Sequence, residues 1–302
     1  MFTIAHLTDP HLGPLPRPRR RDLVSKRLVG YYNWHRSRAH AFSDRVLAAL
    51  IEDMHAGKPD HIVVTGDLVN IALPAEMVAA RVWLAELGAP DTVTVIPGNH
   101  DAYVPGAMAE VTTLWRDFMF GDNQSGAVAR FPFVRRRGPV AFIGLSTAVA
   151  TAPFMATGRL GSDQAAALGD QLALLKKEGL FRVVLIHHPP IASLTSWSRR
   201  LIDGGRFRSE IAKHGAELVL HGHNHRLHVS RLAGPDREVP VVGAAAASSA
   251  PDHGLTDGAY NLYRIGGTDG NFTCTMSERG IRTAGDAVET LSEENLTVAT
   301  VS

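Results

Sequence analysis

The sequence predicts an α/β fold, and three observations support this class. Short apolar runs rich in Val and Ile alternate with helical stripes over the first two-thirds of the 302 residues. Five of these runs lead directly into motifs of Asp, His or Asn, as in open sheets that place their chemistry at the carboxyl ends of strands. After residue 225 the pattern changes to strands separated by turns, which predicts a second sheet of mixed or antiparallel type.

The apolar runs predict five buried strands because they are short and bounded by turn residues. They are Phe2–Leu7, His61–Thr65, Thr92–Ile96, Arg182–Ile186 and Glu217–Leu220. Apolar residues at helical spacing, with Pro or Gly near the ends, predict four helices. They are Ser43–His55, Pro74–Leu87, Ala107–Met119 and Ser162–Glu178. The second sheet is predicted to contain Leu227–Leu232, Val239–Gly243, Tyr260–Ile265 and Asn271–Met276. We expect one domain over residues 1–280 and a polar C-terminal tail over 281–302.

Each of the five predicted buried strands leads into a motif with metal-binding side chains. The motifs are Asp9-Pro10-His11, Gly66-Asp67-Leu68-Val69-Asn70, Gly98-Asn99-His100-Asp101, His187-His188 and Gly222-His223-Asn224-His225. In an extended chain, residues two apart point to the same side, so Asp9 and His11 can reach one ion or each can reach one of a close pair. The same holds for His223 and His225. Carboxylate, imidazole and amide donors suit Mn, Fe, Zn or Co, which predicts a metal-dependent hydrolase.

These motifs, in this order, resemble those of the calcineurin-like metallophosphoesterases from about Phe2 to His225. Within that superfamily the chain is similar to bacterial class III cyclic-nucleotide phosphodiesterases and glycerophosphodiesterases. Leu7–His11, Thr65–Leu68 and His187–Pro190 carry this closer similarity. The resemblance implies two face-to-face sheets with helices outside, a four-layer α/β/β/α sandwich.

The resemblance also implies a role for each motif residue. Two divalent transition metal ions (Mn, Fe or Zn) are expected, and a metal-bound hydroxide would attack the phosphorus. Asp9, His11 and His225 would hold one ion, Asn99, His187 and His223 would hold the other, and Asp67 would bridge them. His100 is expected to face the departing oxygen as a cation or general acid, with Asp101 orienting it. Asn70 and His188 would support the ligands.

A basic and aromatic insert, Gly13–His40, separates the first motif from the first predicted long helix. It carries eight Lys or Arg residues against a single Asp22, together with two Tyr and Trp34. Three interpretations remain open: a solvated loop, a lid that supplies cations to a phosphate substrate, or a surface for anionic lipid headgroups. A second candidate lid is Ala192–Arg208. The predicted substrate contacts from both segments are Arg19, Arg20, Arg21, Trp34, Arg199 and Arg200.

Composition limits the remaining classes of function. A formal net charge of +1 does not favour a nucleic-acid partner. The single cysteine, Cys274, excludes an internal disulfide and suits a reducing compartment. No signal-peptide pattern and no apolar stretch of membrane-spanning length is seen, so we expect a cytoplasmic protein. The sequence does not indicate an oligomeric state.

We therefore predict a dinuclear phosphodiesterase that hydrolyses a small phosphodiester of the cyclic-nucleotide or glycerophosphodiester type. One alternative is a pyrophosphohydrolase of a lipid-linked nucleotide, and another is a phosphomonoesterase. A nuclease of the Mre-type branch is disfavoured by the near-zero net charge and the lack of an evident DNA-binding appendage. A non-enzymatic scaffold is disfavoured because all ligands and His100 are present.

Overall fold

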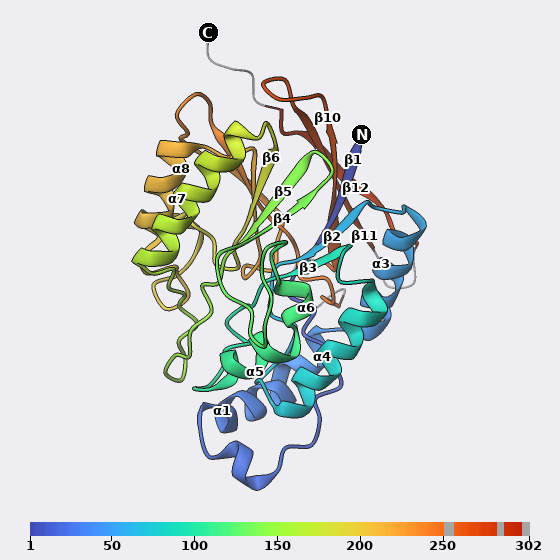
Figure 1. Cartoon of the computed structure of the whole chain (residues 1–302). Helices are drawn as coiled ribbons and strands as arrows, with labels where there is room; N and C mark the ends of the chain where they lie inside the picture. The colour runs from blue at the N-terminus through green and yellow to red at the C-terminus, as the bar shows by residue number, and fades with distance from the viewer. Residues whose placement is uncertain (251–256, 283–286, 298–302) are drawn as a thin grey trace.

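The computed structural model contains two six-stranded mixed sheets packed face to face between outer helices (Figure 1). The structure describes residues 1–250, 257–282 and 287–297. One sheet has the strand order β12-β11-β10-β1-β2-β3, and the other has the order β4-β5-β6-β7-β9-β8. The predicted sandwich of two sheets flanked by helices is therefore confirmed.

The first sheet combines a parallel half with an antiparallel half. Its strands are β1 (Phe2–Leu7), β2 (His61–Val64), β3 (Val93–Val95), β10 (Ala259–Gly266), β11 (Thr273–Gly280) and β12 (Glu289–Asn295). β1, β2 and β3 are parallel, whereas β10 pairs with β1 in antiparallel register and continues into β11 and β12. The carboxyl ends of the three parallel strands therefore lie at one edge.

The second sheet has four parallel strands between two antiparallel edges. Its strands are β4 (Phe133–Arg137), β5 (Val140–Gly144), β6 (Phe181–Leu185), β7 (Leu218–His221), β8 (His228–Leu232) and β9 (Val239–Gly243). β5, β6, β7 and β9 run parallel, while β4 and β8 pair in antiparallel register.

Helices cover the outer side of each sheet. Figure 1 shows α3 and α4 on one side of the molecule and α7 and α8 on the other. The helices of eight or more residues are α1 (Lys26–Asn33), α3 (Asp44–Ala56), α4 (Pro74–Leu87), α5 (Ala107–Leu114), α7 (Ser162–Lys177) and α8 (Gly204–His214). The shorter ones are η1 (Arg20–Leu23), η2 (Trp34–Arg38), α2 (Ala39–Ala41), α6 (Arg116–Met119) and η3 (Ala192–Leu194). Within the described residues, no helix is both long and apolar enough to cross a bilayer.

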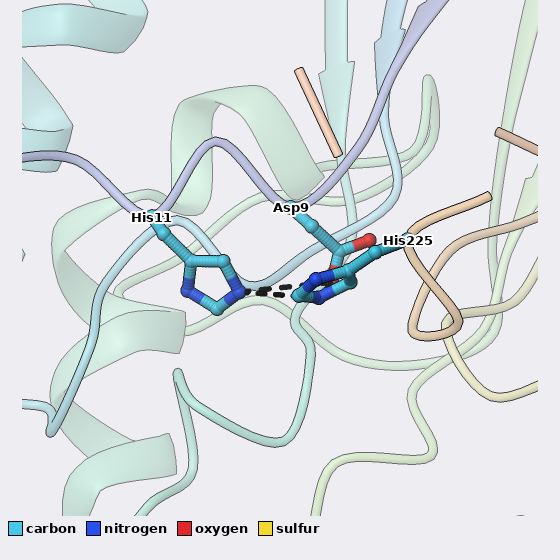
Figure 2. A group of neighbouring side chains, drawn as sticks. All are labelled: Asp9, His11 and His225. Carbon is cyan, nitrogen blue, oxygen red and sulfur yellow. Dashed lines mark hydrogen bonds and ion pairs between the residues drawn. The ribbon is translucent and has the colours of Figure 1, made fainter. Parts of the chain in front are cut away.

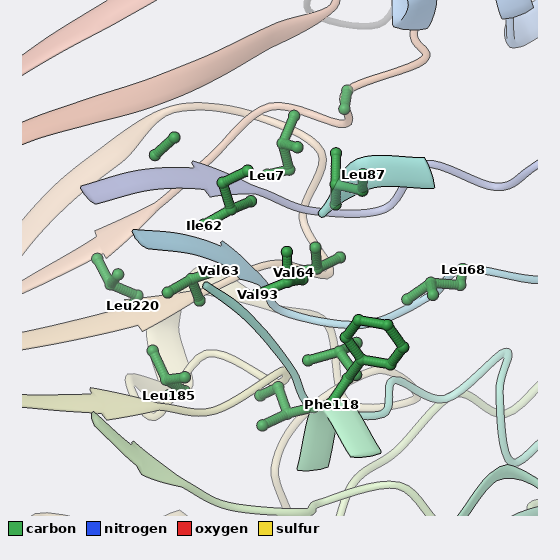
Figure 3. Packing of buried hydrophobic residues seen from close by; sticks show 14 of the residues in the cluster. Leu7, Ile62, Val63, Val64, Leu68, Leu87, Val93, Phe118, Leu185 and Leu220 are labelled. Atoms are coloured by element: carbon green, nitrogen blue, oxygen red, sulfur yellow. The ribbon is translucent and has the colours of Figure 1, made fainter. Parts of the chain in front are cut away.

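The core lies between the sheets and beneath the helices. Side chains of a strand alternate between its two faces, and in β6 Val183 and Leu185 face the other sheet while Val184 packs under α7 and α8. Figure 3 shows Leu185 and Leu220 of the second sheet beside Val63 of the first. Because β6 and its neighbours are buried on both faces, their sequences are mostly apolar, and the buried Arg182 of β6 is paired with Glu217.

The strand membership of the sheets differs from the prediction. The motif-bearing strands divide between both sheets, and the strands after residue 225 join these two sheets instead of forming a separate one. The hairpin β4–β5 was missed. The predicted tail over 281–302 contains β12, which pairs with β11. The predicted helix Ala107–Met119 is divided into α5 and α6 at Trp115. Cys274 is buried and free, as expected.

Candidate metal centre

The five motifs meet at the carboxyl ends of parallel strands from both sheets. Loops after β1, β2 and β3 carry the Asp9, Asp67 and Asn99 motifs, and loops after β6 and β7 carry the His187 and His223 motifs. Three groups of Asp and His donors result, each with ligand atoms within 4.8 Å of one another. The predicted convergence of the motifs at one place is therefore confirmed.

The first group consists of Asp9, His11 and His225 (Figure 2). Asp9 Oδ1 lies 3.2 Å from His225 Nε2 and 4.0 Å from His11 Nε2. The other carboxylate oxygen accepts hydrogen bonds from the Thr8 hydroxyl (2.7 Å) and the His223 N–H (2.9 Å). Asp9 Oδ1 is buried and accepts no hydrogen bond from the described residues. A buried oxygen that accepts no hydrogen bond and faces two imidazole nitrogens fits a bound cation.

The second group consists of Asp67, His187 and His223, with Asn99 between the imidazoles. Asn99 Oδ1 lies 3.2 Å from His187 Nε2 and 2.8 Å from His223 Nδ1. His187 Nδ1 donates to the Thr65 carbonyl at 2.7 Å, which leaves His187 Nε2 as the ligand atom. Burial disfavours charge on His187, but the nearby Asp67 outweighs it and raises the pKa to about 9. A metal ion would take the place of that proton.

Asp67 lies between the two groups. Its Oδ2 is 3.4 Å from His187 Nε2 and 4.0 Å from His11 Nε2. Its Oδ1 accepts the backbone N–H of His100 at 2.7 Å. The carboxylate thus faces imidazoles of both groups, which is the arrangement required of a shared ligand.

His100 stands at the border of the centre. One of its ring nitrogens lies within 4.8 Å of the donors of His11 and Asp67. Nδ1 is hydrogen-bonded to the Asn70 carbonyl, and the ring stacks on Tyr103 with centroids 5.5 Å apart. The imidazole is therefore held in orientation beside the ligands while remaining partly exposed.

Comparison with known proteins gives the family. A family model described as calcineurin-like phosphoesterase matches residues 2–227. The chain belongs to this family. A curated relative, a probable cyclic nucleotide phosphodiesterase of Synechococcus sp., is 30% identical over 185 residues, which cover 59% of this chain. The match spans 63% of that relative, less than two-thirds of its length.

Two solved structures share the fold of this chain. A dimetal phosphatase from Danio rerio has a TM-score of 0.62 at 11% identity, covering 98% of both chains. A purple acid phosphatase from yellow lupin (Lupinus luteus) seeds has a TM-score of 0.61 at 12% identity, covering 97% of this chain and 53% of the lupin chain. At these identities the likeness shows the fold alone.

The calcineurin-like phosphoesterase centre is built on strained backbone. The left-handed φ region is costly for residues other than glycine. Five of the predicted ligands nevertheless adopt it: Asp9 (49°), His11 (39°), Asp67 (55°), His223 (71°) and His225 (54°). Such conformations cost of order 1–3 kcal/mol each and persist only where the surrounding structure holds them. The strain is concentrated at the donor groups, as expected of a functional site.

Asp101 occupies a position that differs from the predicted one. Its carboxylate accepts backbone N–H groups of Asp67 (2.8 Å), Leu68 (2.9 Å), Val69 (3.2 Å) and Gly98 (2.7 Å). It therefore fastens the loops after β2 and β3 together. The His100 ring is instead fixed by the Asn70 carbonyl and Tyr103. Burial and the Asp67 charge raise the pKa of Asp101 to about 8, against the effect of the N–H donors.

Asn70 and His188 support the ligand loops. The Asn70 side chain donates to the Leu12 carbonyl at 2.9 Å, which joins the loops after β1 and β2. His188 lies 2.7 Å from the Thr147 hydroxyl and 3.2 Å from the Ala156 carbonyl. Burial lowers the pKa of His188 well below its ordinary value, so it packs as a neutral ring beside His187.

A recess of about 250 Å³ opens beside Asn99 and His100. Trp34 and Arg199, two of the predicted substrate contacts, line it. The other four predicted contacts, Arg19, Arg20, Arg21 and Arg200, are not among its lining residues. Lys26, Asn33 and Tyr103 also line the recess and were not predicted as substrate contacts. Spacings of three and four residues place Lys26, Val29, Gly30 and Asn33 on one face of a helix, and this pattern was the available signal.

Proposed function

We propose that this chain is a dinuclear metal-dependent phosphoric ester hydrolase that acts on a small phosphodiester. The observation that carries the proposal is the position of Asp67 between two donor groups, with His100 beside them. The relative named as a probable cyclic nucleotide phosphodiesterase supports a diester of the cyclic-nucleotide or glycerophosphodiester type.

The residues of the centre divide the work of the reaction. Asp9, His11 and His225 would hold one ion, Asn99, His187 and His223 would hold the other, and Asp67 would join the two sets. When bound, such a pair supplies a nucleophile at neutral pH and neutralises charge on the phosphoryl oxygens. His100 holds a proton next to the oxygen of the departing alcohol, where negative charge develops.

Metal analysis tests the dinuclear proposal. We expect about two divalent ions per chain in the wild type, because two donor sets are present. Asp67→Ala is expected to lose more than one ion, since both sets depend on this carboxylate. One tightly held ion in the wild type, unchanged in Asp67→Ala, would contradict the proposal.

A hydrolysis panel on protein reconstituted with Mn, Fe or Zn tests the substrate class. The panel contains cyclic nucleotides, a glycerophosphodiester, a nucleoside-diphosphate lipid, an aryl monoester and single-stranded DNA. Turnover of the small diesters supports the proposal. Preferential turnover of the nucleoside-diphosphate lipid or of the monoester favours one of the two alternatives instead.

The outer side of the insert suggests a second partner, a surface with anionic lipid headgroups. Leu28 and Tyr32 are 57% and 62% exposed and lie four residues apart in α1, so they share a face. Val24, 84% exposed, lies in the turn just before this helix. The same insert carries exposed arginines, namely Arg17, Arg19, Arg20, Arg21 and Arg36. We propose that this apolar face and these arginines bind a membrane surface carrying anionic lipid, because apolar burial and attraction to anionic lipid act together at an interface.

Vesicle sedimentation tests the lipid surface. At low salt the wild type is expected to bind phosphatidylglycerol vesicles and not phosphatidylcholine vesicles, with loss of binding in Leu28→Glu/Tyr32→Glu and in the triple charge reversal of Arg19, Arg20 and Arg21. Added salt should act like the charge reversal, because exposed charges are screened over about 10 Å at 0.1 M. Val78 and Val82 of α4 are each 54% exposed, also four residues apart, so Val78→Glu/Val82→Glu is the matched control. Failure of the wild type to bind anionic vesicles would contradict the proposal.

A further inference from the structure

The inner side of α1 is docked firmly over the candidate centre. Arg27 Nε donates to the Ile71 carbonyl at 3.0 Å, and another nitrogen of its guanidinium donates to the Ala72 carbonyl. A Cβ at Gly30 would lie only 2.5 Å from the Tyr103 hydroxyl oxygen and 2.7 Å from an Ile71 carbon, so only glycine allows this close approach. The insert therefore forms a wall of the recess and is not merely a solvated loop.

Lys26 presents an ammonium group in this wall. Its Nζ donates to the Thr151 hydroxyl at 2.7 Å and to the Met155 carbonyl at 2.9 Å, and lies 4.5 Å from the centre of the Tyr103 ring. Burial lowers the pKa of Lys26 to about 8, although the Asp67 charge opposes this shift. No carboxylate of the described residues lies within ion-pair distance of Lys26. A half-buried cation without an anionic partner is poised for an anion from outside the chain.

The lining of the whole recess is positively charged, as Lys26 is. Two cationic side chains, Lys26 and Arg199, line it, and its lining residues, all within the described part of the chain, include no Asp or Glu. Arg199 is oriented by a hydrogen bond of 2.8 Å from its guanidinium to the His223 carbonyl. Trp34, Tyr103 and Phe154 add aromatic surface. The recess thus suits a group that is both negatively charged and flat or apolar in part.

The position of the recess indicates which part of a substrate would enter it. It includes Asn99 and His100 but neither Asp9 nor His225. If His100 faces the departing oxygen, as the proposed function requires, the group that enters this recess is the leaving group. Its properties then determine which esters are accepted.

We propose that Lys26 and Arg199 bind a second phosphate carried by the leaving group, so that the preferred substrate is a diphosphate ester of a nucleoside. The proposal rests on the metal-dependent phosphoric ester hydrolase activity proposed above, and within that activity it selects the pyrophosphohydrolase alternative over the cyclic-nucleotide type of diester. Water oxygen bonds to the distal phosphorus, the bridging P–O bond breaks, and its electron pair leaves with the nucleoside monophosphate. The products are two phosphate monoesters and a proton. The nucleoside of the leaving group would lie against Trp34 and Tyr103.

The test compares Lys26→Met with the wild type on two substrates, UDP-glucose and bis(p-nitrophenyl) phosphate. Only in the first does the leaving group carry a phosphate, and hence a negative charge, before the bond breaks. We expect KM for UDP-glucose to rise about 10- to 100-fold, the range for loss of a hydrogen bond between charged groups, with a much smaller change for the aryl diester. Lys177→Met removes an exposed lysine from the last turn of α7 and is the matched control. Metal content and thermal unfolding verify that each variant is folded.

The outcomes separate this inference from the proposed function. A selective rise in KM supports it. Equal losses on both substrates overturn it, because Lys26 would then hold the scissile phosphate. An unchanged KM for UDP-glucose overturns it as well. Turnover of the aryl diester without any turnover of UDP-glucose also overturns it while leaving the proposed function intact. Absence of all turnover in metal-loaded protein contradicts the proposed function. In that case calorimetric titration with uridine monophosphate tests the inference. Weaker binding to Lys26→Met than to the wild type supports it, and equal binding overturns it.

Discussion

At the scale of single residues, two neighbouring side chains of one motif have separate tasks. The His100 imidazole lies beside the donors of His11 and Asp67 and is partly exposed. The Asp101 carboxylate is completely buried and is occupied by four backbone N–H groups. One position can therefore be changed to probe chemistry, and the other to probe the rigidity of the loops.

His100→Ala is expected to retain its metal and its fold but to lose turnover by about two to four orders of magnitude, the range for a positioned proton donor. The backbone N–H that donates to Asp67 is retained in alanine. The loss should be smaller for a nitrophenolate leaving group, which needs less protonation. Steady-state kinetics on aryl and alkyl esters measure the difference, and equal losses on both would exclude the acid role.

Asp101→Asn is expected to destabilise the protein by about 2–4 kcal/mol, since an amide NH2 cannot accept from two of the backbone donors that it would face. Denaturant unfolding of the metal-free protein measures the change. Stability equal to that of the wild type, together with a defect confined to turnover, would instead restore the predicted role of Asp101 in orienting His100.

At the scale of elements, an ion pair connects α3 to the antiparallel half of the first sheet. Asp53 of α3 accepts hydrogen bonds from Arg279 Nε (2.9 Å) and from the Tyr260 hydroxyl (2.7 Å). Burial opposes charge on Asp53, but these bonds outweigh it and lower its pKa below the ordinary value. A carboxylate with a depressed pKa stabilises the fold at pH values above its unfolded pKa and loses that effect as the pH falls through the folded value.

Asp53→Asn is therefore expected to cost about 1–2 kcal/mol at pH 7, a hydrogen-bonded ion pair discounted for its partial exposure. The difference from the wild type should shrink below about pH 4, near the unfolded pKa of an aspartate. Urea unfolding at pH 7 and at pH 3.5 measures both values. Asp91→Asn serves as control, because Asp91 is 96% exposed beside Arg137. A difference that is constant with pH would refute the assignment.

Some strands could not be predicted because they contain charged residues. The hydrogen-bond partners that allow such residues to be buried are distant in sequence. β4 contains three consecutive arginines, yet Arg135 is only 2% exposed since its guanidinium donates to the carbonyls of Phe120, Pro90, Val93 and Asp117. β12 is an edge strand with exposed glutamates, so its alternation is weak. Strands buried on both faces, such as β6, were predictable from their apolar runs alone.

At the scale of the whole molecule, the donor groups draw on both sheets. Asp9, Asp67 and Asn99 follow strands of the first sheet, and His187 and His223 follow strands of the second. Bound ions would therefore connect the two layers and offset the repulsion between the buried carboxylates. The stability of the sandwich should depend on occupancy of the centre.

Removal of metal with a chelator is expected to lower the unfolding temperature by about 5 °C, as for loss of a ligand present at about a hundred times its dissociation constant. Addition of Mn, Fe or Zn should restore it. Differential scanning calorimetry measures both steps, with the already metal-poor Asp67→Ala as the reference that should hardly respond. An identical unfolding temperature with and without chelator would show that the ions do not join the layers.

The donor set was predictable from sequence because each proposed ligand follows an apolar strand and lies in a short motif, as for His223 after β7. The recess beside Asn99 and His100 was not predictable, because it is formed by distant segments that only the fold brings together. Lys26 meets Thr151 and Met155 from another loop across 125 and 129 residues of chain. The spacing of residues within a short segment does not predict such long-range contacts.

The pairing of β1 with β10 has a consequence for shortened forms of the chain. β1 lies between β2 and β10, with Phe2 opposite Ile265. A polypeptide ending at residue 227, where the family match ends, would retain every proposed ligand. It would nevertheless expose the backbone amides and carbonyls of β1 along a hydrophobic edge, which invites self-association. The proposed ligands therefore all lie within the first 225 residues, whereas the folded unit extends further along the chain. Truncation from the C-terminus should leave β11 intact.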